Sequence, residues 1–399
     1  MRVWPTLLVL IGVCRVVSAG TLEAADWAQW RGPNRNGSSP ETGLSVTWPA
    51  EGPKKLWEYK IGGGHSSPVI VQKRLYILAA GNVVSLDADT GALIWKSPLG
   101  APNAPTNYYT PAVDGKVVYG LNDMGLLAAL DADTGKQLWA VDLPKELGVP
   151  SNGKDPVAMG SPLVLADRII LSRGLALDKA TGKLAWKAAD LLPNGTYVSP
   201  TVFTAGDVKG VVFYTGTKLV ALAQEKGDPL WSVDLPWWAK NSYADAIALP
   251  GQIFFDGAVV NLEGEKPVLL KSGKALGASI ANPAVWDGNI YASCGGWGHN
   301  PKPDSYQLKC VDGKTFDVKW SKPGIWGPLL AVDGKILAAT HKGEIVAVKA
   351  SPDGYQELAR AMICPGAEKD VCWATPAFAD GKFYMRRGGL LVCLDLRGK

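Results

Sequence analysis

Nine side chains that could bind a ligand lie in loops around short apolar runs. They are His65, Tyr108, Tyr109, Met159, Tyr197, Tyr243, Trp297, Trp326 and Trp373. Aromatic and polar residues that converge on a concave surface form the usual kind of ligand site. The alternative is that they fill a narrow channel and pack on one another. No residue among them is assigned a catalytic role.

The ionisable residues form none of the usual catalytic or metal-binding patterns. His65, His299 and His341 each stand alone, with no second histidine or cysteine at ligand spacing. No Gly-x-Ser-x-Gly, P-loop or dinucleotide-binding motif occurs. We therefore predict no catalytic residue and no metal site.

Two cysteines could form a disulfide bond. Cys364 and Cys372 flank Pro365-Gly366-Ala367 in one loop, close enough to bridge in an oxidising compartment. Five of the six cysteines follow Ala19, so at least one of these five is free or pairs between chains. The sequence leaves the bridged and the reduced states of Cys364 and Cys372 open.

The composition and the N-terminal residues limit the classes of protein to which this chain could belong. Of 399 residues 47% are hydrophobic and 20% charged, so a large core can form. Basic and acidic residues number 41 and 37 without a basic run, which argues against a nucleic-acid partner. Residues 1–19 resemble a signal peptide, with Arg2, an apolar stretch and Val17-Ser18-Ala19; a cut after Ala25 is the second option. We expect an exported protein, periplasmic or extracellular, with no membrane span after cleavage.

A repeated pattern indicates how the chain is organised. It consists of a small residue, an acidic turn with Thr-Gly, and a tryptophan ten positions after the small residue. Clear or partial copies end at Trp95, Trp139, Trp186, Trp231 and Trp320, weaker copies at Val268 and Leu358, and an eighth copy opens at Cys393. Repeats whose copies are roughly 40–50 residues apart predict stacked supersecondary units.

A second mark precedes most copies and predicts the strands. It is a small or polar residue before proline: Ser67, Thr110, Ser161, Ser199, Asn282, Gly327 and Thr375; the unit near Ile247 lacks it. Alternating runs follow, and in four units Asp-Gly pairs separate the first two strands, at Asp114, Asp287, Asp333 and Asp380. Each unit is therefore a four-stranded antiparallel meander, and radial stacking buries both of its faces.

The two ends of the chain complete one unit. The eighth unit stops at Lys399 before its fourth strand, while residues 55–60 look like a fourth strand with no unit before it. Placing Trp57 beside Cys393 closes the ring without an exposed edge. The sequence predicts an all-β, eight-bladed β-propeller over residues 55–399, after a lead segment at residues 20–54.

The tryptophans of the repeat are expected to be structural. We predict that they pack between neighbouring blades and donate their indole N–H groups to carbonyls. They are Trp57, Trp95, Trp139, Trp186, Trp231 and Trp320.

The repeat resembles the tryptophan-docking motif of quinoprotein propellers, known as PQQ-like repeats. Residues 27–37, Trp-Ala-Gln-Trp-Arg-Gly-Pro-Asn-Arg-Asn-Gly, also resemble the opening of many exported PQQ-like proteins. That family holds pyrroloquinoline-quinone (PQQ) dehydrogenases and cofactor-free scaffolds of the BamB type, so the resemblance implies the fold and leaves the function open.

We expect an exported, monomeric, non-catalytic scaffold without a cofactor, which binds a protein or peptide partner in the cell envelope. The alternative is a PQQ-dependent alcohol or sugar dehydrogenase with Ca²⁺. The quinoprotein alcohol dehydrogenases carry a disulfide between adjacent cysteines, and this chain has no adjacent cysteines. Glycan binding by the aromatic residues among the nine loop residues named above is a third hypothesis.

Overall fold

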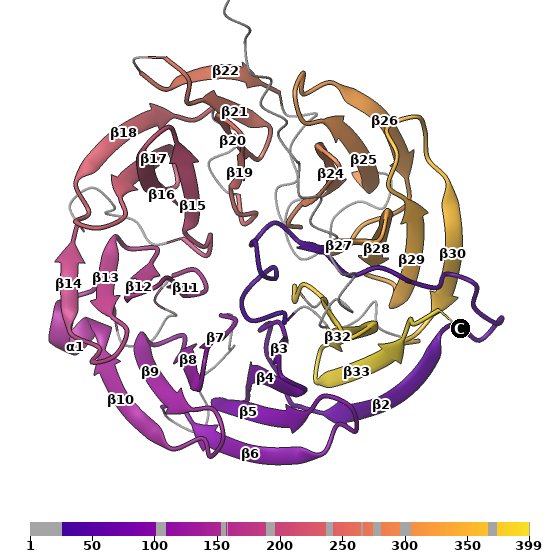
Figure 1. The fold of residues 1–399 in the computed structure, drawn as a ribbon, viewed down its shortest axis with the longest axis horizontal. Helices are drawn as coiled ribbons and strands as arrows, with labels where there is room; N and C mark the ends of the chain where they lie inside the picture. The colour runs from indigo at the N-terminus through magenta and orange to yellow at the C-terminus, as the bar shows by residue number, and fades with distance from the viewer. Residues whose placement is uncertain are drawn as a thin grey trace, which may run out of the picture.

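The strands form eight sheets that stand around a central axis, as Figure 1 shows. The computed structural model describes residues 26–100, 109–152, 157, 159–188, 196–236, 242–264, 266–273, 281–295, 305–365 and 373–398. Each sheet is an antiparallel meander of four strands, and one carries an additional parallel strand. The predicted eight-bladed β-propeller is confirmed.

The first four blades follow one another along the chain. Blade 1 holds β3 (Val69–Val71), β4 (Arg74–Ala79), β5 (Asn82–Asp87) and β6 (Leu93–Pro98). Blade 2 holds β7 (Ala112–Asp114), β8 (Val117–Leu121), β9 (Leu126–Asp131) and β10 (Gln137–Asp142), and is followed by the short helix α1 (Leu143–Leu147). Blade 3 holds β11 (Leu163–Val164), β12 (Arg168–Leu171), β13 (Leu175–Asp178) and β14 (Leu184–Lys187). Blade 4 holds β15 (Thr201–Ala205), β16 (Val208–Tyr214), β17 (Lys218–Ala223) and β18 (Pro229–Asp234).

The second half of the ring ends on a blade that both ends of the chain share. Blade 5 holds β19 (Ile247–Leu249), β20 (Gln252–Phe255), β21 (Ala258–Asn261) and β22 (Val268–Ser272). Blade 6 holds β23 (Ala284–Trp286), β24 (Asn289–Cys294), β25 (Gln307–Asp312) and β26 (Val318–Pro323). Blade 7 holds β27 (Leu329–Val332), β28 (Lys335–Ala339), β29 (Glu344–Lys349) and β30 (Glu357–Met362), with β1 (Ser38–Ser39) added to β27. Blade 8 holds β31 (Ala377–Ala379), β32 (Lys382–Arg387), β33 (Leu390–Asp395) and β2 (Lys54–Lys60).

The predicted closure of the ring is present in blade 8. Strand β2 pairs with β33, and Trp57 lies opposite Cys393 in the antiparallel register. The N-terminal strand therefore fills the outermost place that the C-terminal strands leave open, next to β33 in Figure 1.

Tight turns join the first and second strands at one face of the ring, which we call the turn face. Asp287-Gly288, Asp333-Gly334 and Asp380-Gly381 all have positive φ at both residues, as the prediction of two-residue hairpins requires. At Asp114-Gly115 the turn is one residue later than predicted, because Asp114 pairs with Val117 as the last residue of β7.

The acidic residues of the repeat cap the turns between third and fourth strands, also at the turn face. The Asp87 Oδ1 atom accepts hydrogen bonds from the backbone N–H of Thr90 at 2.8 Å and from the Thr90 hydroxyl at 2.8 Å. Asp131 with Thr134 and Asp178 with Thr181 repeat both bonds. Such local bonds fix the turn and explain why Asp and Thr recur at this spacing.

Neighbouring blades are joined where a tryptophan packs on the glycine of the next turn. Trp95 and Tyr76 of blade 1 both donate to the Ala132 carbonyl of blade 2, at 3.0 and 3.3 Å. A Cβ atom on Gly135 would lie 2.7 Å from the Trp95 ring, so no larger residue fits there without movement. The same contact joins three other pairs of blades: Trp57 with Gly91, Trp139 with Gly182, and Trp186 with Gly227.

The joint between blades 5 and 6 differs from the expected pattern. Val268 does not take the tryptophan position, because Lys271 lies opposite Val259 just before the bulge. The Lys271 Nζ atom donates to the Thr315 carbonyl of blade 6 at 3.0 Å. Phe316 stands where other turns have glycine, with φ +57°, and its buried ring stacks on Phe254 of blade 5. At this joint the aromatic ring is that of Phe316, in the turn of blade 6. The outer strand of blade 5 supplies Lys271 in place of a tryptophan.

Blade 7 also lacks the tryptophan. Ala359 lies opposite Ala347 before its bulge, so the predicted position at Leu358 is one residue too early. Ala361, on the same strand, contacts the turn that precedes β2, since a Cβ atom on Gly52 would lie 2.6 Å from the Ala361 Cβ atom.

We predict that Gly135→Ala destabilises the fold much more than Gly115→Ala. Both glycines have positive φ, but a Cβ atom on Gly115 would meet nothing within 4 Å. Gly115→Ala should cost only the backbone strain, about 1 kcal/mol, whereas Gly135→Ala should cost about 2–4 kcal/mol because it also displaces Trp95. Urea unfolding of both variants measures the difference, and equal losses would contradict the packing of Trp95 on the turn.

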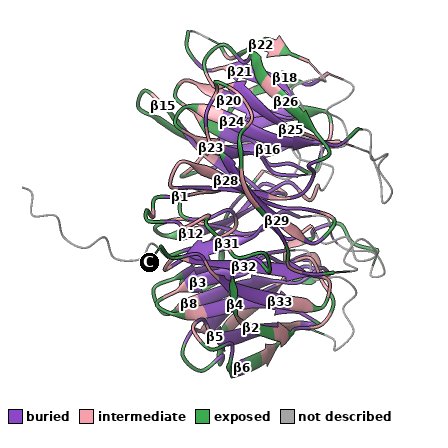
Figure 2. Ribbon diagram, turned by 90° about the vertical axis from the view of Figure 1, so that its right-hand side faces the viewer, coloured by how far each residue is buried: buried purple, intermediate pink, exposed green. Residues whose placement is uncertain are grey.

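The second face of the ring, which we call the mouth face, has longer connections. Strand β10 ends at Asp142 and β11 begins at Leu163, while β30 ends at Met362 and β31 begins at Ala377. Edge-on, the buried strands lie between these two faces, with β1 and the C-terminus at the turn face (Figure 2). In the part of the chain that the structure describes, no helix has the length and apolar character needed to cross a membrane.

Candidate functional site

A ring of hydrogen bonds surrounds the central channel where the innermost strands begin. In blades 2 to 6 one side chain, which in four of these blades belongs to the residue before the proline, accepts the backbone N–H of its counterpart in the preceding blade. The bonds run from Ser67 to Thr110 (2.9 Å), Thr110 to Ser161 (3.0 Å), Ser161 to Ser199 (3.1 Å), Ser199 to Asp245 (2.7 Å) and Asp245 to Asn282 (2.7 Å). We call these six residues the axial ring.

The axial ring explains why a small or polar residue recurs before proline, because its side chain accepts a hydrogen bond from the preceding blade. In blade 5 the pattern is corrected. Blade 5 lacks the proline mark, but Asp245 takes the same place and makes both bonds of a ring member. A carboxylate therefore stands where the neighbouring blades have Ser, Thr or Asn.

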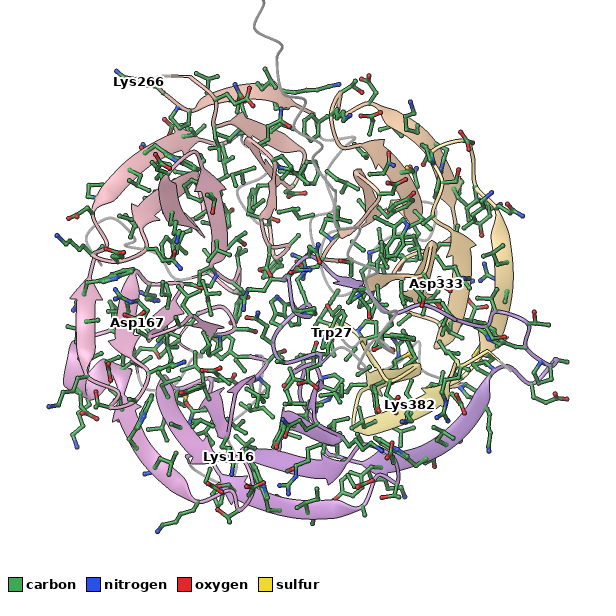
Figure 3. All side chains as sticks on the ribbon, in the orientation of Figure 1. Trp27, Lys116, Asp167, Lys266, Asp333 and Lys382 are labelled. Atoms are coloured by element: carbon green, nitrogen blue, oxygen red, sulfur yellow. The ribbon has the colours of Figure 1, made fainter. Side chains whose placement is uncertain are left out.

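Residues 26–44, which we call the axial segment, fill the channel from the turn face. Trp27 forms a bridge with Ile70 of blade 1, and the Ala28 carbonyl accepts the Val113 N–H of blade 2. Ser38 and Ser39 pair with β27 of blade 7. Further hydrogen bonds from the segment reach blades 3, 5, 6 and 8. In Figure 1 the indigo segment crosses the middle of the ring, and Figure 3 labels Trp27 close to its centre.

Three side chains of the axial segment extend to the axial ring. Trp30 donates its indole N–H to Asp245 Oδ2 at 2.5 Å, and Arg31 Nη1 lies 3.9 Å from the same oxygen. Arg31 Nη2 donates to the Pro283 carbonyl at 2.5 Å, and Arg35 Nη1 to the Pro162 carbonyl at 3.1 Å. The lead segment is thus anchored to three blades by its most polar residues.

These charged groups lie in a nearly water-free environment. Arg31 and Asp245 are 1% and 4% exposed. Burial lowers the pKa of Arg31 and of Arg35 to about 10, so both remain cations at neutral pH. Burial raises the pKa of Asp245, against the opposing charges of Arg31 and Arg35.

The sequence did not identify this cluster as a site. Its signals were two arginines in the otherwise uncharged motif of residues 27–37 and an aspartate in place of the missing proline mark. No local pattern joins them, because Trp30 and Asp245 are 215 positions apart.

Most of the predicted mouth residues lie two positions before the channel-lining residue of their blade. Tyr109 and Met159 are buried and pack within the protein: the Tyr109 hydroxyl donates to the Val157 carbonyl at 2.6 Å and accepts the Met159 N–H at 3.0 Å. His65 is half-buried. Tyr108 and Trp297 lie outside the described residues.

Trp326 is the centre of an aromatic group that we call the mouth cluster. Tyr306 stacks on it with ring centroids 5.2 Å apart, and Trp373 and His341 approach it edge-on, each at 5.6 Å. Trp326 is 3% exposed, whereas Trp373 and His341 are half-buried. The desolvation of His341 lowers its pKa. Sequence reasoning selected Trp326 and Trp373 but missed Tyr306 and His341.

A second aromatic group comes from blades 4 and 5. Tyr197 and Tyr243 stack with ring centroids 6.0 Å apart. Tyr243 is 47% exposed, the most open of the described mouth residues. The predicted residues therefore form two aromatic groups at different places on the ring, rather than one continuous set.

The repeat tryptophans lie between blades. Five of them donate their indole N–H to a carbonyl of the next blade: Trp57, Trp95, Trp139, Trp186 and Trp320. Trp231 packs on Phe203 of its own blade, with ring centroids 5.8 Å apart.

Four described cysteines are free and buried. They are Cys294, Cys310, Cys364 and Cys393. Burial raises the pKa of the Cys364 thiol, and Cys372 lies outside the described residues. A disulfide bond between Cys364 and Cys372 therefore stays an untested alternative.

PQQ bound through Ca²⁺ would need several oxygen ligands for the metal at one place. Within the described ranges, no group of three or more His, Cys, Asp or Glu residues could hold a metal ion. The one acid in the axial ring, Asp245, already accepts bonds from Trp30 and Ser199.

Comparisons with known proteins point to two functional classes on one fold. The sequence profile of the family described as outer membrane protein assembly factor BamB matches residues 45–189 and 79–261, together more than half of the chain. BamB of Moranella endobia is 32% identical over 149 residues, 36% of this chain and 37% of that protein. The quinohemoprotein alcohol dehydrogenase ADH-IIG of Pseudomonas putida is 30% identical over 153 residues, 33% of this chain and 20% of that enzyme.

A solved structure shows the same architecture. Quinohemoprotein alcohol dehydrogenase from Comamonas testosteroni superposes with a TM-score of 0.70 at 16% identity, covering 94% of this chain and 81% of that one. At this identity the likeness concerns the fold alone. The sequence matches to the two relatives above span less than half of each relative's length.

Proposed function

Since this chain belongs to the family described as outer membrane protein assembly factor BamB, we propose that it is a non-catalytic propeller scaffold of the cell envelope. It binds a protein or peptide partner at the mouth face. The predicted signal peptide at residues 1–19 would bring it there.

The observation that carries this proposal is the difference between the two ends of the channel. At the turn face the axial segment fills the channel, and two-residue turns such as Asp333-Gly334 leave little surface for recognition. At the mouth face the connections are longer and carry aromatic residues. Loops on a rigid scaffold are the usual place for binding residues.

The mouth aromatics suit a macromolecular partner better than a small substrate. Tyr243 is 47% exposed and Trp373 is half-buried, and their rings pack on Tyr197 and Trp326 respectively. Exposed tyrosine and tryptophan on a rigid base are typical of the residues that contribute most at protein interfaces.

We predict that Tyr243→Ala combined with Trp373→Ala abolishes partner binding without unfolding the propeller. The partner is captured from an envelope extract by cross-linking, identified by mass spectrometry, purified and titrated by calorimetry. The loss of two aromatic anchors should weaken binding by about a hundredfold or more. Trp326→Ala is unsuitable for this test because Trp326 is buried and its loss would disturb the fold.

A double variant of the outer strands provides the control. Leu138 and Leu270 are 53% and 55% exposed and lie on β10 and β22, away from the mouth. Leu138→Ala with Leu270→Ala should leave binding unchanged. If this control loses the partner while the mouth variant keeps it, the binding face is the outer wall and the proposal is wrong.

The dehydrogenase alternative has its own test. The similarity to ADH-IIG favours it, but the described residues offer no Ca²⁺ ligand set. We predict that the protein shows no PQQ binding tighter than millimolar in the presence of Ca²⁺, and no PQQ-dependent oxidation of ethanol or glucose. Calorimetry and a dye-linked oxidation assay measure both, and micromolar uptake of PQQ would establish the alternative.

A further inference from the structure

Two nitrogen atoms of Arg31 lack hydrogen-bond acceptors at the centre of the molecule. Nε and Nη1 of Arg31 are buried and make no hydrogen bond, although Nη2 bonds the Pro283 carbonyl. The nearest carboxylate oxygen, of Asp245, is 3.9 Å from Nη1, beyond hydrogen-bond distance. Buried donors almost always have partners, and leaving a charged one unpaired costs more than leaving a neutral one.

The charges at this place do not balance. Arg31 and Arg35 are both buried cations, and among the described residues Asp245 is the one acid whose charge acts on them. Both oxygens of Asp245 already accept hydrogen bonds, from Ser199 and from Trp30. The cluster therefore carries at least one excess positive charge, and two if Asp245 is protonated. An uncompensated buried charge is strongly unfavourable, so a counterion is expected.

The axial ring is also incomplete near this position. Blade 7 has Gly327 before its proline, and a Cβ atom there would lie 2.0 Å from the Ala339 carbonyl oxygen. A side chain is thus excluded from one place of the ring. The Ser67 hydroxyl and the Trp326 indole N–H are buried without a hydrogen-bond partner as well. Among the described residues, several buried polar groups around the channel thus lack a partner.

We propose that the centre of the propeller binds a small monovalent anion, of the size of chloride or formate, through the Nε–H group of Arg31. The Nε–H group points to the side of the guanidinium away from Nη1, the nitrogen nearest to Asp245, so an anion can bind Nε there. One negative charge balances the cluster when Asp245 is ionised. Arg31 is 1% exposed, so an anion bound to it would be shielded from bulk solvent. This inference is independent of the partner-binding proposal.

Thermal unfolding of the full mature chain tests the site. The melting temperature is measured in sodium chloride and in sodium formate, against sodium gluconate at the same ionic strength. An anion that binds only the folded state stabilises it by mass action. We expect a saturable rise, of about 3 °C at a hundredfold excess over Kd, in chloride or formate and none in gluconate.

Three variants assign the effect to Arg31. Arg31→Gln should melt lower and lose the anion dependence. Arg386→Gln is the matched control, because Arg386 is equally buried but its nitrogens bond the carbonyls of Gly388, Leu78 and Gly62. It should also melt lower yet keep the dependence. Asp245→Asn removes the competing carboxylate and should lower the Kd for the anion by at least tenfold.

Bromide replaces chloride in a measurement that needs no variant. Anomalous diffraction from crystals grown in bromide should show a peak within about 3.5 Å of Arg31 Nε. A water molecule at this place, with identical melting temperatures in chloride, formate and gluconate, would overturn the proposal. Anion dependence that survives Arg31→Gln would overturn it too, since the anion would then bind elsewhere.

Discussion

A mature chain that starts at Ile61 is expected not to fold. The deletion removes β2, which supplies the outer strand of blade 8, and the axial segment, which bonds to blades around the whole ring. The loss opens one blade and empties the channel, and the combined cost exceeds the roughly 5–15 kcal/mol by which such domains are stable. Circular dichroism and limited proteolysis of the shortened chain measure the loss.

Two further proteins, a shortened chain and a point variant, separate the contributions of the N-terminal elements to folding. A chain that starts at Asp26 keeps both elements and should melt like the full mature protein. Trp57→Ala keeps β2 but removes its contact with Gly91 and its bond to the Ala88 carbonyl. It should lower the free energy of unfolding by about 3–5 kcal/mol without preventing folding. A chain starting at Ile61 that unfolds cooperatively at the normal temperature would show that neither element closes the ring.

The blades could be predicted because their signals are local and repeated. Asp87 and Thr90 form their turn within four residues, and the turn at Asp333-Gly334 needs positive φ at two adjacent positions. Each unit thus contains the sequence signals for its own strands, and the recurrence of these signals in eight units identifies the repeat. The closure was predictable because Trp57 belongs to the same repeat as the other docking tryptophans.

The register of blade 5 could not be predicted from the repeat. Counting from Ala258 placed the docking residue at Val268, but in this blade the bulge lies one residue pair further from the turn and brings Lys271 opposite Val259. The compensating residue, Phe316, lies in another blade and in a backbone conformation that is unusual for phenylalanine. Contacts between units of this kind leave no periodic signal.

The contacts at the centre of the molecule could not be predicted either, because they join residues that are far apart in the sequence. The axial segment binds residues such as Pro162, Asp245 and Pro283, which follow it by more than a hundred positions. The mouth cluster likewise gathers Tyr306 and His341 from different blades around Trp326. The sequence offered packing and ligand binding as alternatives for the mouth aromatics, and burial at Tyr109 and Met159 favours packing for those two.

Trp95→Ala is expected to lower the free energy of unfolding by about 3–5 kcal/mol, the usual cost of emptying a large aromatic position. Trp95 is 9% exposed, donates to the Ala132 carbonyl, and packs on Gly135. Trp95→Phe keeps a ring on the glycine and loses mainly the hydrogen bond, so it should cost about 1–2 kcal/mol. Urea unfolding provides each value.

The contact itself is measured by combining Trp95→Ala with Gly135→Ala. A Cβ atom at residue 135 collides with the indole ring in the native protein, but the ring is absent after Trp95→Ala. The second substitution should then cost only its backbone strain, about 1 kcal/mol, and the two losses should fall short of additivity by about 1–3 kcal/mol. Strict additivity would mean that the tryptophan and the glycine do not touch. The joint between blades would then depend on the hydrogen bonds that Trp95, Tyr76 and Arg74 donate to the Ala132 carbonyl of blade 2.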